Sequence, residues 1–314
     1  MLNTFKTSAV ALLLALSFGH TTATAAGYTQ TKYPIVMVHG IFGFDSIGPV
    51  EYFYGIPSAL RADGARVYLV QVSAANSHEA RGEQLLTQVN QILAATGSTK
   101  VNLIGHSQGS PTARYVASVS PSLVASVTSV DGVNKGSAIA DIVLKVAPPG
   151  SITNTAISSA ANGIASVVSF ISNGKGLSQD SLKAVTSLST AGTAKFNLAH
   201  PAGVPTSACG EGAYSVTKGT SKVNYYSWGG ASAYTNVLDI VDPLFALTSL
   251  GFGGAQNDGM VSVCSQRLGK VIRADYKMNH MDAVNQTVGI VNLFETNPVS
   301  VFRAHANRLM LAGL

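Results

Sequence analysis

The sequence predicts an α/β fold in which helices flank a mainly parallel central sheet. Two observations lead to this class. Apolar runs of strand length alternate with segments of helical periodicity along the 314 residues, which is the order that a parallel sheet requires. One run, at residues 101–104, leads into a Gly-x-Ser-x-Gly motif that opens a helix-like segment. Because no stretch between residues 30 and 314 resembles a linker, we expect a single domain over residues 27–314.

The elements are expected in the following order. Residues 77–96 carry leucine, isoleucine and valine at helical spacing, and Gly97 ends this helix. A terminal helix follows Asn297-Pro298, because asparagine suits the cap and proline the first helical position. Apolar runs predict strands at residues 34–38, 65–72, 101–104, 123–130, 223–228 and 270–274.

Composition narrows the class of protein further. Charged residues make up 11% of the chain, against about a quarter in ordinary soluble proteins, and this excludes ordinary disorder. The net charge of +5 is scattered and forms no cluster of lysine and arginine, so no nucleic-acid partner is expected.

The motif around Ser107 has the pattern of a nucleophile elbow. Ser107 would occupy a strained turn between a strand and a helix, and Gly105 and Gly109 would let these two elements approach each other. A serine hydroxyl needs a base to become nucleophilic, and in this arrangement an acid and then a histidine follow later in the chain. Asp258, within Asn-Asp-Gly, and His280 follow in that order. The alternative is a glycine-rich turn that only connects strand to helix.

In this interpretation His280 takes the proton of Ser107, and Asp258 fixes the tautomer of the imidazole. Asp131 is the alternative acid, because it directly follows an apolar strand-like run, a position from which some serine hydrolases take their carboxylate. The tight Asn-Asp-Gly turn favours Asp258. Other histidines have weaker sequence contexts or are expected to be structural: His39, His78, His106, His200 and His305.

Two backbone N–H groups are expected to stabilise the anion that forms when Ser107 attacks a carbonyl group. One belongs to Gln108, directly after the serine, and the other to Ile41 in the glycine-containing loop after the first strand. Phe42 and Phe44, in the same loop, either line the substrate cleft or pack in the core.

The first residues have the pattern of an export signal. Lys6 supplies positive charge, residues 10–16 form an apolar run, and small residues at 23–26 offer a cleavage site, so residues 1–26 are expected to be removed. The apolar run is too short to span a bilayer, and no later segment has about 18 uninterrupted apolar residues. We therefore expect a secreted protein without a transmembrane anchor.

The chain has two cysteines, Cys209 and Cys264. In the oxidising compartment that an exported protein enters, they are expected to form one disulfide, the alternative being a free catalytic cysteine. The bridge would hold the segment after Asp258 and stabilise the fold by ~2–4 kcal/mol.

Residues 146–174 contain no charged side chain, and several of their apolar residues form one helical stripe. We expect a helical lid that covers an apolar cleft in water and turns its apolar face toward a lipid surface. The alternative is a helix packed permanently in the core.

These features together resemble the bacterial triacylglycerol lipases of the Pseudomonas and Burkholderia type, which depend on a dedicated foldase. The resemblance covers essentially the whole mature chain. It rests on the segments 33–36, 39–40, 55–60, 81–85, 101–109, 206–212, 257–259, 279–282 and 305–309. The chain departs from the family pattern at Ser110, where a further glycine is frequent, and at Asp131, in a segment usually free of acid.

The resemblance implies an α/β-hydrolase fold with a lid, one disulfide and one structural calcium ion (Ca²⁺). The calcium ligands would be the side chains of Asp239 and Asp282 and the backbone carbonyls of Gln286 and Ile290. Calcium prefers such oxygen ligands, and the ion would brace the loop that carries His280. The alternative is that both acids are ordinary surface residues.

The expected activity is hydrolysis of carboxylic esters, above all triacylglycerols at an oil–water interface, through an acyl-enzyme on Ser107. The alternatives are a carboxylesterase for smaller esters, an acyltransferase that uses the same residues, and a non-catalytic lipid binder. The uncharged lid segment favours the lipase. The resemblance adds a foldase chaperone as a partner during secretion.

Overall fold

The computed structural model describes residues 27–47, 50–146 and 177–314. The predicted signal at residues 1–26 lies outside the described residues, and so does the predicted lid from residue 147 onward.

Seven strands form the central sheet in this part of the chain, in the order β4-β1-β5-β6-β8-β7, with β9 beside β8. Every pair is parallel except β7 with β8, which confirms the predicted sheet. The strands are β1 (Ile35–Val38), β4 (Val67–Val70), β5 (Val101–His106), β6 (Val124–Val130), β7 (Ser215–Lys218), β8 (Ser221–Gly230) and β9 (Lys270–Tyr276). A separate short hairpin pairs β2 (Ser46–Ile47) with β3 (Val50–Glu51).

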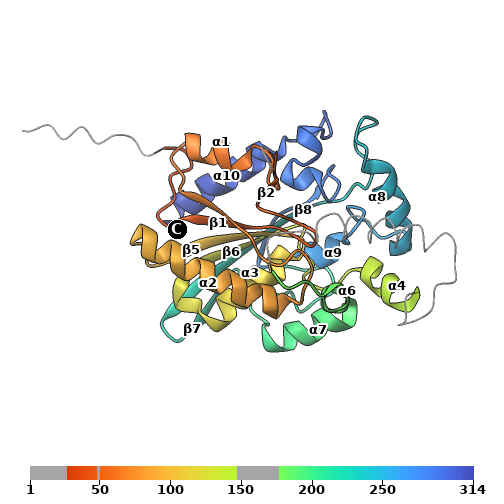
Figure 1. The fold of residues 1–314 in the computed structure, drawn as a ribbon. Helices are drawn as coiled ribbons and strands as arrows, with labels where there is room; N and C mark the ends of the chain where they lie inside the picture. Colours follow the sequence, from red (N-terminus) through yellow and green to blue (C-terminus); the bar gives the residue numbers. More distant parts are fainter. Residues whose placement is uncertain (1–26, 48–49, 147–176) are drawn as a thin grey trace, which may run out of the picture.

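Helices cover both faces of the sheet (Figure 1). On one face lie α1 (Ile56–Ala62) and α10 (Pro298–Leu311), and on the other lie α2 (His78–Thr96) and α3 (Gly109–Val119). Further helices in the described residues are α4 (Ala138–Val146), α6 (Ser181–Leu188), α7 (Thr190–Ala199), α8 (Asp242–Ser249) and α9 (Val263–Gln266). Short 3₁₀ turns occur at Pro121–Leu123, Leu250–Phe252, Asp282–Val284 and Thr287–Gly289.

Helix α2 ends and helix α10 begins at the capping residues that the sequence predicts. Ser77 caps α2 by accepting a hydrogen bond from the N–H of Ala80, and Gly97 ends the helix in the left-handed conformation that glycine adopts without strain. The side chain of Asn297 accepts from the N–H of Val299 at the start of α10, so the predicted terminal helix is confirmed.

Two apolar cores lie on opposite faces of the sheet, because side chains alternate along each strand. Ile35 and Met37 of β1 face α1 and α10, where they join a cluster that includes Phe302. Val36 and Val38 join the cluster formed with α2 and α3. Burial on both faces explains why the central strands are continuous apolar runs rather than alternating ones.

Because the strands are parallel, their carboxyl ends lie together on one side of the molecule. Ser107 follows β5, Asp131 follows β6, and the loop that contains Ile41 follows β1. In Figure 1, α4, α6, α8 and α9 gather at this end of the molecule. Residues far apart in sequence therefore meet where open α/β sheets place their ligand sites.

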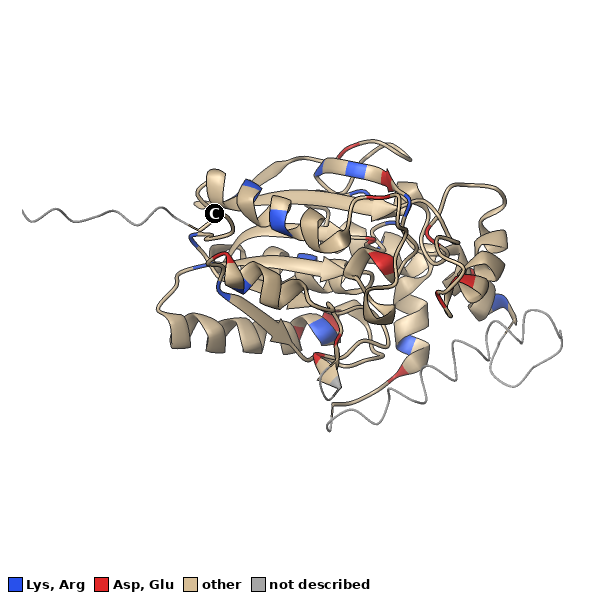
Figure 2. Ribbon diagram, turned by 90° about the horizontal axis from the view of Figure 1, so that it is seen from above, with Lys and Arg blue, Asp and Glu red and all other residues tan. Residues whose placement is uncertain are grey.

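Cys209 and Cys264 form a disulfide, with their Cα atoms 4.4 Å apart, as predicted. The bond ties the loop before β7 to α9, close in sequence to Asp258. Lysine and arginine residues are scattered over the ribbon rather than collected on one face (Figure 2). Within the described ranges, no helix combines the length and the hydropathy needed to cross a membrane.

Candidate active site

Ser107 occupies a nucleophile elbow. Its φ angle is 55°, in the left-handed region that ordinary residues rarely adopt, and its N–H donates to the carbonyl of Val130 at 3.0 Å. A Cβ at Gly105 would lie 2.2 Å from the carbonyl oxygen of Gly109, and a Cβ at Gly109 would lie 2.2 Å from that of Val38. Both glycines are therefore sterically required, which confirms the predicted turn.

His280 and Asp258 are hydrogen-bonded. The imidazole Nδ1 lies 2.7 Å from Asp258 Oδ2, and the carboxylate is fully buried. Asp258 Oδ1 also accepts from the N–H groups of Met260 at 2.8 Å and Val261 at 2.6 Å. Because a carboxylate only accepts, Nδ1 must carry a proton, and Nε2 is left as the basic nitrogen when the ring is neutral.

A further partner of Asp258 is Gln266 in α9, a residue that no sequence motif predicted. Gln266 Nε2 donates to Asp258 Oδ2 at 3.0 Å and to the carbonyl of Gly230 at 2.9 Å. These bonds fix the carboxylate against the end of β8. No motif marks this glutamine, so only the folded structure could reveal its contact.

Asp131 is also buried at this site, but His280 Nδ1 is bonded to Asp258 rather than to it. Asp131 Oδ1 accepts from the N–H of Gly230 at 2.7 Å. Burial, and then the negative charge of Asp258, raise the pKa of Asp131 well above its usual value. The structure therefore separates the two candidate acids: one carboxyl is paired with the histidine and the other favours its neutral form.

The ring nitrogens of His106 and His280 and a carboxylate oxygen of Asp131 lie within 4.8 Å of one another. This composition would suit a metal ion, yet both nitrogens of His106 are engaged. Nδ1 accepts from the hydroxyl of Tyr52 at 2.6 Å, and Nε2 donates to the carbonyl of His280 at 2.9 Å. Burial lowers the pKa of His106 well below its usual value, so it stays neutral and positions the backbone of His280.

The other candidate histidines make structural hydrogen bonds. His39 bonds to the carbonyl of Gly40 and accepts from the N–H of Val72, and burial lowers its pKa to about 3. His305 is fully buried in α10 and bonds to Thr128, in agreement with its expected structural role. His78 and His200 contact Gln108 and Ser118, respectively.

The two predicted oxyanion donors lie beside the serine. Ile41 and Ser107 line the same cavity, and Gln108 is the next residue after Ser107. Among residues 27–47, 50–146 and 177–314, no acceptor is hydrogen-bonded to the backbone N–H of either Ile41 or Gln108. Both donors are thus available to an anionic oxygen.

Arg81 holds the loop that carries Ile41, although it is fully buried. Its guanidinium donates to the carbonyl of His39 at 2.6 Å and also to the carbonyl of Ser73. The sequence contains a signal for this role. Arg81 lies one helical turn before Leu85 and two before Val89, on the face of α2 that is buried. A charged residue on such a face needs internal partners.

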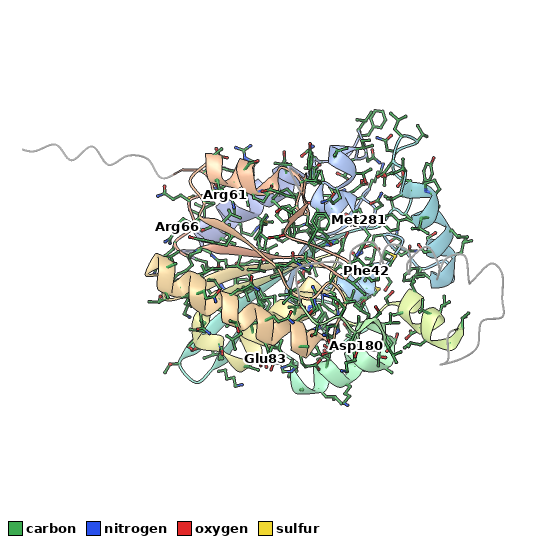
Figure 3. The ribbon with its side chains drawn as sticks, in the orientation of Figure 1. Phe42, Arg61, Arg66, Glu83, Asp180 and Met281 are labelled. Atoms are coloured by element: carbon green, nitrogen blue, oxygen red, sulfur yellow. A yellow bond between two sulfur atoms is a disulfide. The ribbon has the colours of Figure 1, made fainter. Side chains whose placement is uncertain are left out.

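An apolar cavity of about 200 Å³ opens at Ser107 and His280. Phe42 and Phe44 both line it, and Phe44 also packs against the apolar core that contains Tyr52, so it combines the two roles considered for it. Figure 3 labels Phe42 and Met281, two of its lining residues from distant parts of the chain. A second, smaller cavity also contacts Ser107 and extends toward α4 and α6 through side chains that include Val133, Val143, Val185 and Leu188.

The two predicted carboxylate ligands of calcium lie near each other, and the other two predicted ligands, Gln286 and Ile290, flank the 3₁₀ turn Thr287–Gly289. Asp239 and Asp282 are buried, and both accept from Asn279, at 3.4 Å and 3.1 Å. Asp282 Oδ1 is buried without a hydrogen-bond partner among the described residues. Asp242 is a third acid in this cluster. Both of its carboxylate oxygens already accept hydrogen bonds from the protein, one from the N–H of Thr235 and one from the side chain of Asn279, each at 2.7 Å.

Comparison with known proteins defines the class and then the family. A model of the alpha/beta hydrolase fold matches residues 33–257. The mature form of the Bacillus licheniformis lipase BlEst2 has a similar structure, with a TM-score of 0.62 over 91% of this chain and 94% of that chain at 17% identity. By fold, the chain is an α/β hydrolase.

Comparison of sequences narrows this fold class to one family. A triacylglycerol lipase of Vibrio cholerae serotype O1 is 56% identical over 288 residues, covering 92% of this chain and 91% of the relative. Triacylglycerol lipases of Pseudomonas fragi and Burkholderia plantarii are 42% and 41% identical, each over 91% of this chain and over 98% and 88% of their own lengths. The chain belongs to the triacylglycerol lipase family, and the resemblance seen in the sequence is confirmed.

Proposed function

We propose that this protein hydrolyses triacylglycerols at the surface of a lipid phase, with Ser107 as nucleophile, His280 as general base and Asp258 as the partner of the base. The observation that carries the proposal is the 2.7 Å bond between His280 and Asp258, beside an elbow serine that shares an apolar cavity with His280. This combination places a base beside a candidate nucleophile on a cavity that suits an apolar ester.

The geometry supports the following steps. Ser107 Oγ attacks the ester carbonyl carbon while its proton passes to His280 Nε2, and Asp258 stabilises the imidazolium that forms. The N–H groups of Ile41 and Gln108 stabilise the tetrahedral oxyanion. When the intermediate collapses, the alcohol leaves with the proton of His280. Water then attacks the acyl carbon while its proton passes to the same nitrogen. When this second intermediate collapses, the bond to Ser107 Oγ breaks, Oγ takes the proton back from His280 Nε2, and the fatty acid leaves.

An exposed apolar surface beside the cavity supports a lipid substrate. Val237, Leu238 and Ile240 are 72–84% exposed and directly precede Val241, which lines the cavity. Phe294, 94% exposed, belongs to a neighbouring segment that is joined to the first by a hydrogen bond from Asn236 to Val291. Large apolar side chains gathered around a cleft mouth are typical of proteins that bind an apolar phase.

The test compares wild-type protein and Ser107→Ala on emulsified long-chain triacylglycerol and on a dissolved short-chain ester. We expect a preference for the emulsion, loss of about six orders of magnitude in kcat for the variant, and stoichiometric labelling of Ser107 in the wild type by a phosphonate. A preference for the dissolved ester would identify a carboxylesterase instead. Transfer of the acyl group to an added alcohol in place of water would identify an acyltransferase.

We also propose one structural calcium ion, held by the carboxylates of Asp239 and Asp282 and the backbone carbonyls of Gln286 and Ile290. The unpartnered oxygen of Asp282 fits such an ion, and burial raises the pKa of this residue to about 7, so a cation would favour its ionised form. When bound, the ion would supply only positive charge and rigidity to the loop after His280.

We further infer that the protein is secreted and that a foldase assists its folding. The signal pattern in the sequence and the disulfide between Cys209 and Cys264 support export. The proposal of a foldase rests on the resemblance to foldase-dependent lipases. Refolding the unfolded, oxidised protein alone tests it, since full spontaneous recovery of activity would remove the proposal.

A further inference from the structure

Asp131 is a buried acid that the proposed mechanism does not use. It lies directly after β6, its side chain is fully buried, and its φ angle of 45° belongs to the strained left-handed region. Strain and burial of a carboxyl group both cost free energy, so the surroundings of Asp131 must compensate through specific contacts.

The contacts of its two oxygens differ. Oδ1 accepts a hydrogen bond from the N–H of Gly230 at 2.7 Å. Oδ2 is buried and accepts no hydrogen bond from the described residues. An ionised carboxylate would leave this second oxygen without a donor, whereas a neutral carboxyl group would carry its proton there and act as a donor itself.

An acceptor for that proton is present. Both carboxyl groups lie beside His280: Asp258 Oδ2 is 2.7 Å from its Nδ1, and an oxygen of Asp131 is within 4.8 Å of one of its ring nitrogens. Two buried carboxyls this close together cannot both remain ionised at low cost. Asp258 already accepts hydrogen bonds from Met260, Val261 and Gln266, whereas Asp131 Oδ2 accepts none from the described residues. The shared proton therefore resides on Asp131.

We propose that Asp131 is a positioning residue of this active site: its neutral carboxyl group donates a hydrogen bond through Oδ2 to the carboxylate of Asp258, and it becomes the anion that supports His280 when Asp258 carries no charge. The proposal rests on the proposed function, because it assigns Asp131 to the same proton transfer.

The second role follows from proximity to the base. A carboxylate oxygen of Asp131 lies within 4.8 Å of a ring nitrogen of His280. If Asp258 becomes a neutral amide, its negative charge no longer opposes ionisation of Asp131, and burial alone is left to raise the pKa of Asp131. Asp131 can then ionise and stabilise the imidazolium across a short, buried distance, where electrostatic interactions are strong.

The experiment measures kcat in a double-mutant cycle of Asp131→Asn and Asp258→Asn. Asparagine at position 131 keeps one donor and one acceptor, so this variant alone should lose about two- to threefold, since an amide is a weaker donor than a carboxylic acid. Asp258→Asn should lose about 10²-fold, less than the about 10⁴-fold that removing a triad acid costs elsewhere. The double variant should lose about 10⁴-fold, far more than the product of the single losses.

A matched control removes an acid that does not contact the site. Asp275 in β9 is exposed and bonds to Arg273, so Asp258→Asn/Asp275→Asn should equal Asp258→Asn alone. A second measurement is independent of activity. Infrared difference spectra between wild type and Asp131→Asn near neutral pH should show the carbonyl band of a neutral carboxylic acid, whether or not the variants turn over substrate.

The outcomes separate the two proposals. If Ser107→Ala retains wild-type activity, the proposed function fails. If Ser107→Ala is inactive but Asp258→Asn and the double variant are equally active, only the role of Asp131 is overturned. Absence of a neutral carboxylic acid band from the infrared difference spectrum would also overturn it.

Discussion

His280 Nδ1 lies 2.7 Å from Asp258 Oδ2, although 22 positions separate the two residues in the chain. The backbone strengthens this pair, because the N–H of His280 also donates to the carbonyl of Asp258 at 2.9 Å. Side chain and main chain thus hold the two loops together at two points. The orientation of the imidazole is set before any substrate binds, which is the condition for efficient proton transfer.

The contact between Gln266 and Asp258 predicts a catalytic defect at a distance from the serine. Gln266→Met keeps the volume of the side chain but removes the donor to Asp258 Oδ2. We expect kcat to fall about tenfold, with little change in KM, since one hydrogen bond to a charged group is worth about 1.5–3 kcal/mol. Gln88→Met in α2, which removes a side-chain hydrogen bond to the carbonyl of Gln71, is the control. Equal effects of the two variants on kcat would contradict the assignment.

The elbow predicts a steric effect at Gly105. In Gly105→Ala the added Cβ would collide with the carbonyl of Gly109, and backbone must move to relieve it. We expect a loss of about 3 kcal/mol in unfolding free energy together with loss of activity. Gly219→Ala is the comparison, because its Cβ meets open space and only its φ of 61° is unfavourable, at about 1–2 kcal/mol. Urea unfolding measures the loss of unfolding free energy in both variants. A smaller loss for Gly105→Ala than for Gly219→Ala would contradict the predicted collision.

The disulfide predicts a stability effect that spreads to the acid loop. Cys209→Ser/Cys264→Ser opens a loop whose ends are 55 positions apart, and should lower the free energy of unfolding by ~2–4 kcal/mol. Hydrogen exchange should rise in the segment that contains Asp258 more than in α2. Uniform exchange across the chain would show that the bridge does not anchor this loop.

Buried histidines predict acid sensitivity. Burial lowers the pKa of both His39 and His78 to about 3, whereas histidine in an unfolded chain titrates near 6.5. The unfolded state therefore binds more protons, and stability falls as pH decreases from about 6.5 toward 3, by up to ~1.4 kcal/mol per pH unit for each group. His78→Asn should reduce this slope in urea unfolding followed between about pH 7 and pH 4. An unchanged slope would mean that His78 is not buried in its neutral form.

The calcium proposal predicts a response to chelation. Removal of calcium from the wild-type protein should lower the unfolding free energy by about 2–3 kcal/mol if the ion was present at about a hundred times its Kd. Asp282→Asn should abolish this response, because it removes the charge of a proposed ligand. Asp275→Asn, at an exposed site, should retain it. A chelator without effect on the thermal midpoint of the wild type would remove the proposal.

Several elements could be predicted because their signals are local. The strands and α2 follow from side-chain periodicity, and α10 from its Asn-Pro start. By contrast, α7 was not predicted, because Thr190–Ala199 buries only Thr193 and Phe196 and has no continuous apolar stripe. The edge strand β7 was missed for a related reason, since none of its four residues is fully buried.

By itself, the sequence determined the class of the fold, the elbow at Ser107, the pairing of the two cysteines and the order of acid and base. These depend on periodicity, on glycine where a Cβ cannot fit, and on residue counts. Only the tertiary structure decided which of Asp131 and Asp258 pairs with His280, and brought Gln266 and Arg81 to the site. Such choices depend on contacts of about 3 Å between loops that lie far apart in the chain, and hydrogen bonds form only within that range. Strand register and loop conformation set those distances, and neither is recorded in the local pattern of residues.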